Sequence, residues 1–303
     1  APETGDPLRN WRLIKEGTSV WWQVQSRNKR SVALDLRQTE GQTIARQLIA
    51  EADVLVENFR PGTLEGWGMS PEELHQLNPG LVMLRISGYG QTGPYRDLPG
   101  FGAIGEAMGG LRHLTGEPGR VPVRVGVSIG DTLAALHGTI GVLTALYHRK
   151  VNGGKGQVID VALHEAVFNV MESLIPEYSA FGVVREAAGS ALPGIAPSNA
   201  YPCTDGWVLV AGNGDSIFKR LMDAIGRPDL GAAPDQRAGD SVMQAHPETT
   251  EHPFTHLQQA FAGLLHKLAV LVQYLRQLVH GLATSGVVAD ASRLGEEHRG
   301  IRI

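Results

Sequence analysis

Leu81-Val-Met-Leu-Arg-Ile-Ser-Gly-Tyr-Gly-Gln-Thr-Gly93 is the stretch on which the fold depends, because an apolar strand runs directly into a glycine-rich loop. Further strands are expected at residues 31–36, 53–57 and 157–163. A helical pattern from Thr39 to about Ala52 separates the first two. Strands that alternate with helices in this way predict an α/β fold with a parallel sheet and right-handed crossovers.

The helices between these strands carry recognisable signals. The first would bury one face formed by Ile44, Leu48 and Ile49. The second opens at Ser70-Pro-Glu-Glu73, where the serine is the expected N-cap, the proline suits the first turn and the last glutamate completes a capping box. Ligands bind beyond the carboxyl ends of parallel strands. The loops at residues 58–62 and 87–93 are therefore candidate binding segments.

Val125-Gly-Val-Ser-Ile-Gly-Asp-Thr-Leu-Ala-Ala-Leu-His137 places one carboxylate, Asp131, where a long helix begins. Asp131 could be a plain N-cap, because a carboxylate accepts hydrogen bonds from free N–H groups of the first turn. It could equally be a nucleophile, since a helix N-terminus favours an ionised carboxylate. Local sequence leaves both readings open. The helix should run to about Lys150 and bury an apolar face comprising Leu133, Leu136, Ile140, Leu143, Leu146 and Tyr147.

Composition excludes several classes of protein. The chain has 303 residues, a net charge of −4, 38 glycines and one cysteine, Cys203. Without a long basic run it is not expected to bind nucleic acid. One cysteine rules out a disulfide framework and indicates a reducing compartment, so we expect a cytoplasmic protein, or one of the mitochondrial matrix in a eukaryote. No apolar run approaches the roughly 20 residues of a membrane span, and the N-terminus lacks the features of a signal peptide.

Downstream, the strand at 157–163 should lead into a helix that begins at His164 and ends near Leu174. The next expected elements are a strand at 207–211 and a helix at 216–225. Two short segments have alternative readings. Asn28-Lys-Arg30 is a solvated turn or a phosphate clamp, and Asn152-Gly-Gly-Lys-Gly156 reads as a turn because it lacks the spacing and order of a phosphate loop.

The character of the chain changes after Gly231. Residues 232–258 lack a regular hydrophobic period, whereas residues 264–279 fit a helix. Six of the eleven histidines lie between His246 and His298, but their spacing does not predict a metal site. The break in pattern favours a frame-shifted translation over a divergent end of the same protein.

Taken together and in order, several short motifs make residues 1 to about 231 resemble the class III CoA-transferase family, of the formyl-CoA transferase and carnitine CoA-transferase type. No single motif is specific, and the evidence lies in their combination. They are Gly5-Asp-Pro7, residues 28–36, Glu57-Asn-Phe-Arg-Pro-Gly62, Leu77-Asn-Pro79, residues 86–94, Gly109-Gly-Leu111 with Thr115-Gly116, Gly130-Asp131, Gly154-Lys-Gly-Gln157, Thr204-Asp-Gly206 and residues 225–230.

The resemblance implies a fold and an assembly. We expect a CoA-binding, Rossmann-like large domain over 1–180, with an incomplete N-terminus, and the start of a smaller α/β domain over 181–231. Residues 232–303 would be the divergent tail. The family forms interlocked homodimers.

The resemblance also implies a reaction, in which Asp131 is the nucleophile. Asp131 attacks an acyl-CoA such as succinyl-CoA, CoA moves onto its carboxyl group as a thioester, and a carboxylic acid acceptor then takes the CoA. The CoA thioester is a substrate, and no cofactor is bound permanently. Asn58 and Phe59 are expected beside CoA. Arg60, Lys29 and Arg30 are added as candidate phosphate contacts.

The sequence departs from the family pattern at several positions. Members carry an Arg near Gly66 and an acidic residue near Gly102, and a glycine loop that is at best reduced here to residues 187–190. Related racemases use a histidine near Phe101, which this chain lacks, so a transferase is favoured over a 2-methylacyl-CoA racemase. A non-catalytic CoA-binding remnant is the third alternative.

Overall fold

The computed structural model describes residues 4–193, 195 and 197–232. The chain divides into two compact units, residues 1–187 and 188–303, near the boundary predicted at residue 180. The domain assignments themselves stay predictions. The helix expected at 264–279 and the suggested frame-shift fall outside the described residues.

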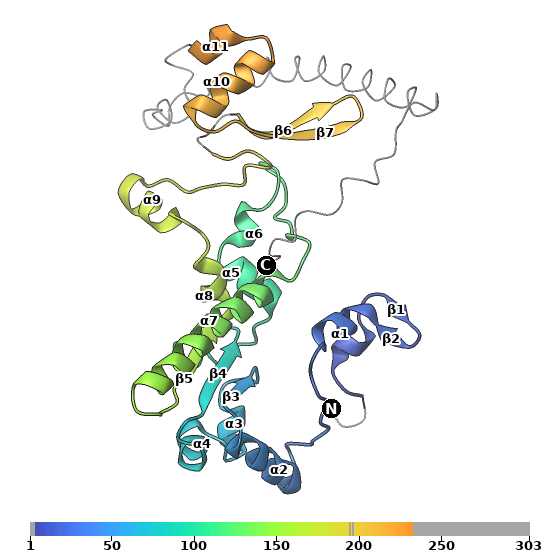
Figure 1. Cartoon of the computed structure of the whole chain (residues 1–303), viewed down its shortest axis with the longest axis vertical. Helices are drawn as coiled ribbons and strands as arrows, with labels where there is room; N and C mark the ends of the chain where they lie inside the picture. Colours follow the sequence, from blue (N-terminus) through green and yellow to red (C-terminus); the bar gives the residue numbers. More distant parts are fainter. Residues whose placement is uncertain (1–3, 194, 196, 233–303) are drawn as a thin grey trace, which may run out of the picture. The chain divides into compact units, whose positions relative to one another are not determined.

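The first unit is built on a three-stranded sheet in the order β3 (Val54–Glu57), β4 (Val82–Ser87) and β5 (Val158–Ala162). Both pairs are parallel, as predicted, and Arg85 lies in register between Glu57 and Asp160. Helices follow β3 and β4 before the next strand begins (Figure 1). The remaining helices of this part are α2 (Thr39–Ala50), α3 (Thr63–Gly66), α4 (Pro71–Leu77), α5 (Gly102–Met108), α6 (Leu111–Leu114), α7 (Ile129–Val151), α8 (Leu163–Phe168) and α9 (Leu174–Phe181).

Successive side chains of β4 point to opposite faces of the sheet, so one strand serves two cores. Met83 packs with residues of α2, α3 and α4, including Ile49 and Leu74. Leu84 packs with Ala134 of α7 and with Ala166 of α8. The predicted capping box at the start of α4 is confirmed, because Ser70 and Glu73 each accept a hydrogen bond from the other's backbone N–H.

The N-terminal segment folds beside this sheet as short elements. They are the 3₁₀ helix η1 (Pro7–Asn10), the small antiparallel pair β1 (Ile14–Lys15) and β2 (Thr18–Ser19), and α1 (Val20–Gln25). The strand predicted at residues 31–36 is wrong, since residues 31–35 form no regular element. Asp35 instead accepts hydrogen bonds from the backbone N–H and the guanidinium of Arg37, which holds a local turn that competes with strand pairing.

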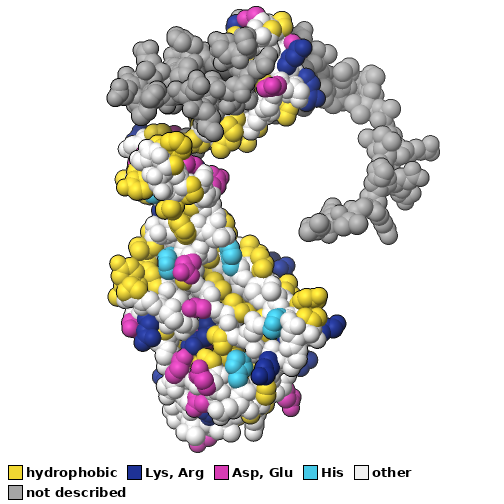
Figure 2. All heavy atoms as spheres, turned by 90° about the vertical axis from the view of Figure 1, so that its left-hand side faces the viewer, with side chains coloured by type: hydrophobic (Ala, Val, Ile, Leu, Met, Phe, Trp, Pro, Cys, Tyr) yellow, Lys and Arg dark blue, Asp and Glu magenta, His cyan; other side chains and the backbone are white. Residues whose placement is uncertain are grey.

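Two apolar faces predicted to be buried are open in this structure. On α2, Ile44 and Leu48 are 44% and 54% exposed, and only Ile49 is buried. On α7 the fully buried residues are small ones such as Ala134 and Gly138. Among the bulky ones, Leu133 and Val142 are partly buried against the core, whereas several others are exposed. The exposed members of that predicted face are Leu136, Ile140, Leu143 and Tyr147. Figure 2 shows hydrophobic side chains open at the molecular surface.

Among the described residues, α7 is long and apolar enough by length and composition to cross a membrane. The expectation that no segment reaches that length is therefore wrong. The helix nevertheless packs on the sheet through its small residues, because a Cβ atom built on Gly138 would lie 2.7 Å from Leu84 of β4.

The helix predicted to end near Leu174 is interrupted. α8 ends at Phe168, and Glu172 takes a positive φ of 55° before α9 begins. In the second unit, the hairpin of β6 (Ser198–Cys203) and β7 (Gly206–Ala211) contains one strand that the sequence did not predict. It is followed by α10 (Asp215–Ala224) and α11 (Pro228–Ala232), and Tyr201, Phe218 and Met222 form its core.

Candidate active site

Asp131 lies in the first turn of α7, three residues after the N-cap, which is Ser128. The N-cap reading of Asp131 is therefore wrong. The other end of α7 is fixed at the edge where the strands begin, because Arg149 bonds to Asp53 at 2.6 Å and to the carbonyl of Gly80 at 2.7 Å. The start of α7 thus lies at the opposite edge, beyond the carboxyl ends of the parallel strands, where ligands are expected.

Glycines allow α5 and α8 to approach Asp131 closely. A Cβ atom built on Gly102 would lie 2.9 Å from Cγ of Asp131, and one on Gly130 would lie 3.0 Å from the carbonyl oxygen of Gly102. Further along α5, a Cβ on Gly105 would lie 2.9 Å from Cβ of Leu163 in α8. Backbone therefore forms the wall behind the carboxylate, as the glycine at position 130 suggested.

Asp131 opens into a cavity of about 1070 Å³, a size suited to a large substrate. Its lining draws on the N-terminal segment, the loop after β3, α5, α6, the segment before α7 and α7 itself. The polar side chains that matter for the chemistry are Asp131, Asn58, Glu106, Arg112, Arg124 and Ser128.

Glu106 is one of the site residues that sequence reasoning missed, together with Arg112 and Arg124. It lies one turn after Gly102 on α5, is 2% exposed and pairs with Arg112, whose Nε donates to Oε2 at 3.0 Å. A buried carboxylate needs such a partner. The available signal was a single charged residue in the otherwise small and apolar helix Gly102-Ala-Ile-Gly-Glu-Ala-Met108.

The surroundings of Asp131 disfavour its charged form. Asp131 is exposed on the cavity side, yet burial of its other side raises the pKa of the carboxyl above its ordinary value, and the negative charge of Glu106 adds to this. Hydrogen bonding to the backbone and the positive charge of Arg124 act in the opposite direction. The carboxylate is thus less well solvated than a free one, which makes it a better nucleophile when ionised.

The five expected coenzyme contacts do not all meet in this cavity. Asn58 lines it. Its neighbour Phe59 packs edge-on against Trp67, with ring centroids 5.2 Å apart, and its backbone N–H donates to the carboxylate of Glu57 at 2.7 Å. Among the described residues, Phe59 and Arg60 are not part of the cavity lining, and Arg60 is exposed.

The short basic segment Asn28-Lys-Arg30 also lies outside the lining of this cavity. Lys29 and Arg30 are exposed, and Nζ of Lys29 donates to the backbone carbonyl of Gln25, which closes a turn after α1. This geometry fits the solvated-turn reading. The part of the chain that the structure describes contains no cluster of three metal-ligating side chains.

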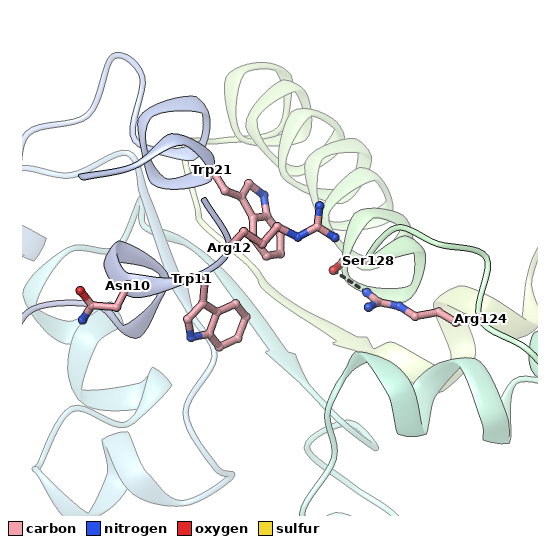
Figure 3. A pocket seen from close by; sticks show the side chains of 6 residues that line it. All are labelled: Asn10, Trp11, Arg12, Trp21, Arg124 and Ser128. Atoms are coloured by element: carbon pink, nitrogen blue, oxygen red, sulfur yellow. Dashed lines mark hydrogen bonds between the residues drawn. The ribbon is translucent and has the colours of Figure 1, made fainter. Parts of the chain in front are cut away.

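A smaller cavity of about 440 Å³ adjoins the first and shares Trp11, Trp21, Arg124 and Ser128 with it. Figure 3 shows the guanidinium groups of Arg12 and Arg124 pointing toward one another across Ser128. Nη2 of Arg124 donates to Oγ of Ser128 at 3.1 Å. The tryptophans give this corner apolar walls.

Comparison with known proteins places these features in a family. A family model described as CoA-transferase family III matches residues 1–283. The chain is 53% identical over 235 residues to a succinyl-CoA–D-citramalate CoA-transferase of Chloroflexus aurantiacus, covering 77% of this chain and 58% of that protein. It is 45% identical over 233 residues to the alpha subunit of a succinyl-CoA–L-malate CoA-transferase of the same species, covering 76% of this chain and 54% of that one. It therefore spans little more than half the length of these relatives.

A solved structure supports the same assignment. The crystal structure of a CaiB/BaiF family protein from Brucella suis matches with a TM-score of 0.71 and 31% identity, and the match covers 94% of this chain and 73% of that chain. The expected α/β fold with a parallel sheet is thereby confirmed, and the interlocked dimer stays a prediction. From its sequence and its fold, the chain belongs to CoA-transferase family III.

Proposed function

We propose that this protein transfers CoA from an acyl-CoA such as succinyl-CoA to a carboxylic acid, through a thioester on Asp131. The observation that carries the proposal is the carboxylate of Asp131, which is accessible at a cavity wall made of backbone, partly desolvated and beside a cation. The names of the relatives, two succinyl-CoA-dependent CoA-transferases, supply the donor.

In this reaction an oxygen of Asp131 attacks the thioester carbonyl of the donor, and the C–S bond breaks. The products are a mixed anhydride and the CoA thiolate. The thiolate then attacks the aspartyl carbonyl, forming the Asp131–CoA thioester and releasing the donor acid. The acceptor carboxylate reverses the two steps. Each step passes through an oxyanion, which backbone N–H groups near Gly130 can stabilise.

Racemisation would need a base to remove the α-proton of the acyl chain. Among the described residues lining the cavity there is no histidine, and Glu106 is tied to Arg112. These features favour the transferase over the racemase.

The exposed apolar face of α7, formed by Leu136, Ile140, Leu143 and Tyr147, supports a homodimer as part of the same proposal. Large apolar side chains left open on one helix indicate a surface that is covered by protein.

Intact mass spectrometry followed by peptide mapping tests the reaction. After incubation with succinyl-CoA, a CoA adduct should appear on the peptide that carries Asp131. Hydroxylamine should convert it to a hydroxamate, and Asp131→Ala should abolish it. Absence of the adduct on folded protein would refute the covalent mechanism.

A further inference from the structure

The smaller cavity is rich in positive charge for its size. Two of its six lining residues, Arg12 and Arg124, are arginines, and none is acidic (Figure 3). Asn10 and Ser128 add neutral polar groups, while Trp11 and Trp21 make the walls. A pocket of this composition suits a small organic anion.

Both guanidinium groups of this cavity lack a carboxylate partner among the described residues. Arg124 donates to the hydroxyl of Ser128, and Arg12 lies over the ring of Trp21 at 4.9 Å from its centroid. The third arginine of the neighbourhood, Arg112, is instead neutralised by Glu106. Two cations thus face the cavity, and neither forms an ion pair with a carboxylate among the described residues.

The location of Arg124 restricts which anion it can meet. Its charge acts on the carboxyl group of Asp131, and Ser128, to which it donates, lies one turn before Asp131 at the start of α7. When the thiol of CoA reaches Asp131, the CoA phosphates lie a whole pantetheine arm away. A cation beside Asp131 therefore faces the acid that exchanges CoA, and not the phosphates.

We propose that Arg124 and Arg12 bind the second carboxylate of a dicarboxylic acid while its first carboxylate reacts at Asp131. This inference rests on the proposed function and deepens it by naming the substrate class. The pair takes no part in bond making or breaking. It holds the far end of the acid, so the reacting carboxylate is positioned against Asp131.

Selectivity follows from the chemistry of the guanidinium group. Arginine binds a carboxylate through two parallel charge-assisted hydrogen bonds, which a methyl group cannot accept. A monocarboxylic acid of the same length places a methyl group between two cations and leaves both without a partner. Sites built around polar partners reject such analogues strongly.

The test compares succinate with butyrate as acceptors for the full chain, in wild type, Arg124→Gln and Arg12→Gln. Assays run at about pH 8, so that Asp131 is ionised in every variant. For Arg124→Gln we expect kcat/KM for succinate to fall by about 30-fold or more, with butyrate changed less than about threefold. Arg12→Gln should show the same selectivity with a smaller loss. Arg120→Gln is the matched control, because Arg120 is an exposed residue of the same loop outside both linings.

Three outcomes would overturn the subsite. The first is an equal loss for both acids. The second is an equal loss of binding for succinyl-CoA and butyryl-CoA, which indicates a CoA phosphate contact. The third is a kcat/KM for succinate, and hence a preference for succinate over butyrate, that stays at the wild-type value in both variants.

Formation of the Asp131 adduct from succinyl-CoA on wild-type protein separates this question from the proposed function. If the adduct forms and the preference is unchanged, the function stands and the subsite fails. If no adduct forms on folded wild-type protein, calorimetric titration with succinate decides. Binding that is lost in Arg124→Gln supports the subsite, and no binding of succinate to wild type overturns it.

Discussion

The α carbon of Gly102 in α5 faces the carboxylate of Asp131 in α7 so closely that no Cβ atom fits between them. The two residues come from helices separated by 20 residues of chain. At Gly66, the other glycine where we expected the family pattern to differ, a Cβ atom would meet nothing within 4 Å. The two positions therefore make a matched pair.

Gly102→Ala should displace the carboxylate of Asp131 and lower the rate of adduct formation by about 10-fold to 100-fold, since small misplacements of a reacting group are costly. Gly66→Ala should leave the rate unchanged and stabilise the protein by up to about 1 kcal/mol, because alanine favours the helix. Single-turnover kinetics with acyl-CoA measure the rate of adduct formation in both variants. Equal rates in the two variants would contradict the contact.

Asp131→Asn is expected to stabilise the protein at neutral pH while abolishing the adduct. The pKa of Asp131 is raised above 3.8, first by burial, so the unfolded chain releases this proton at lower pH than the folded protein does. Ionised Asp131 therefore destabilises the folded protein. This loss of stability begins as the pH rises above the pKa of Asp131 in the unfolded chain, and it is complete above its pKa in the folded protein. Thermal unfolding at about pH 7 should show the gain, and at about pH 3 it should vanish.

Glu106→Gln should move the pH dependence of adduct formation to lower pH, because it removes the negative charge that helps to raise the pKa of Asp131. The variant also leaves Arg112 without its carboxylate. The midpoint is therefore measured on variant protein shown to be folded by circular dichroism. A shift toward higher pH would contradict the placement of Glu106 beside Asp131.

Arg85→Met should cost about 3–5 kcal/mol of unfolding free energy, because it strands a buried negative charge. Nε of Arg85 bonds to Glu57 at 2.7 Å, and the side chain of Glu57 is 3% exposed. Arg37→Met is the control, since Arg37 pairs with Asp35 at the surface, where solvent screening leaves such a pair little effect on stability. Urea titration of both variants checks the contrast, and similar losses would disprove it.

Leu143→Glu should convert the proposed dimer to monomer without lowering the secondary-structure content. The side chain is 62% exposed on α7, so a charge there does not disturb the described core. Light scattering coupled to size exclusion measures the mass. A variant that keeps the wild-type mass would place the contact between chains elsewhere.

The sequence predicted the parts of the fold that depend on local pattern. The apolar strand ending at Ile86 and the capping box at Ser70 are confirmed because each signal lies within a few residues. The periodicity predicted the apolar face of α7, but we expected this chain to bury it. The pattern does not say whether such a face packs against the same chain or against another one. The buried side of α7 is made of Ala134 and Gly138, which carry little hydrophobic signal.

The candidate site was predictable only in part. Asp131 stood out because it follows two glycines at a helix start, and the structure places it at the cavity wall. Glu106, Arg112 and Arg124 were not predicted, because their roles depend on contacts between segments. The short strand at residues 31–36 was overpredicted, since Asp35 satisfies a local turn instead.

The turn that joins α7 to β5 offers a practical handle. Gly153 and Gly154 both have a positive φ that other residues rarely adopt, so the attachment point is the exposed side chain of Lys155 beside them. The 20 residues of α7 that follow Asp131 separate it from this turn by about 30 Å. A fluorophore attached there would report the binding of a labelled acyl-CoA by energy transfer. A linker attached there would fix the enzyme to a sensor chip and leave the end that carries Asp131 open to solvent.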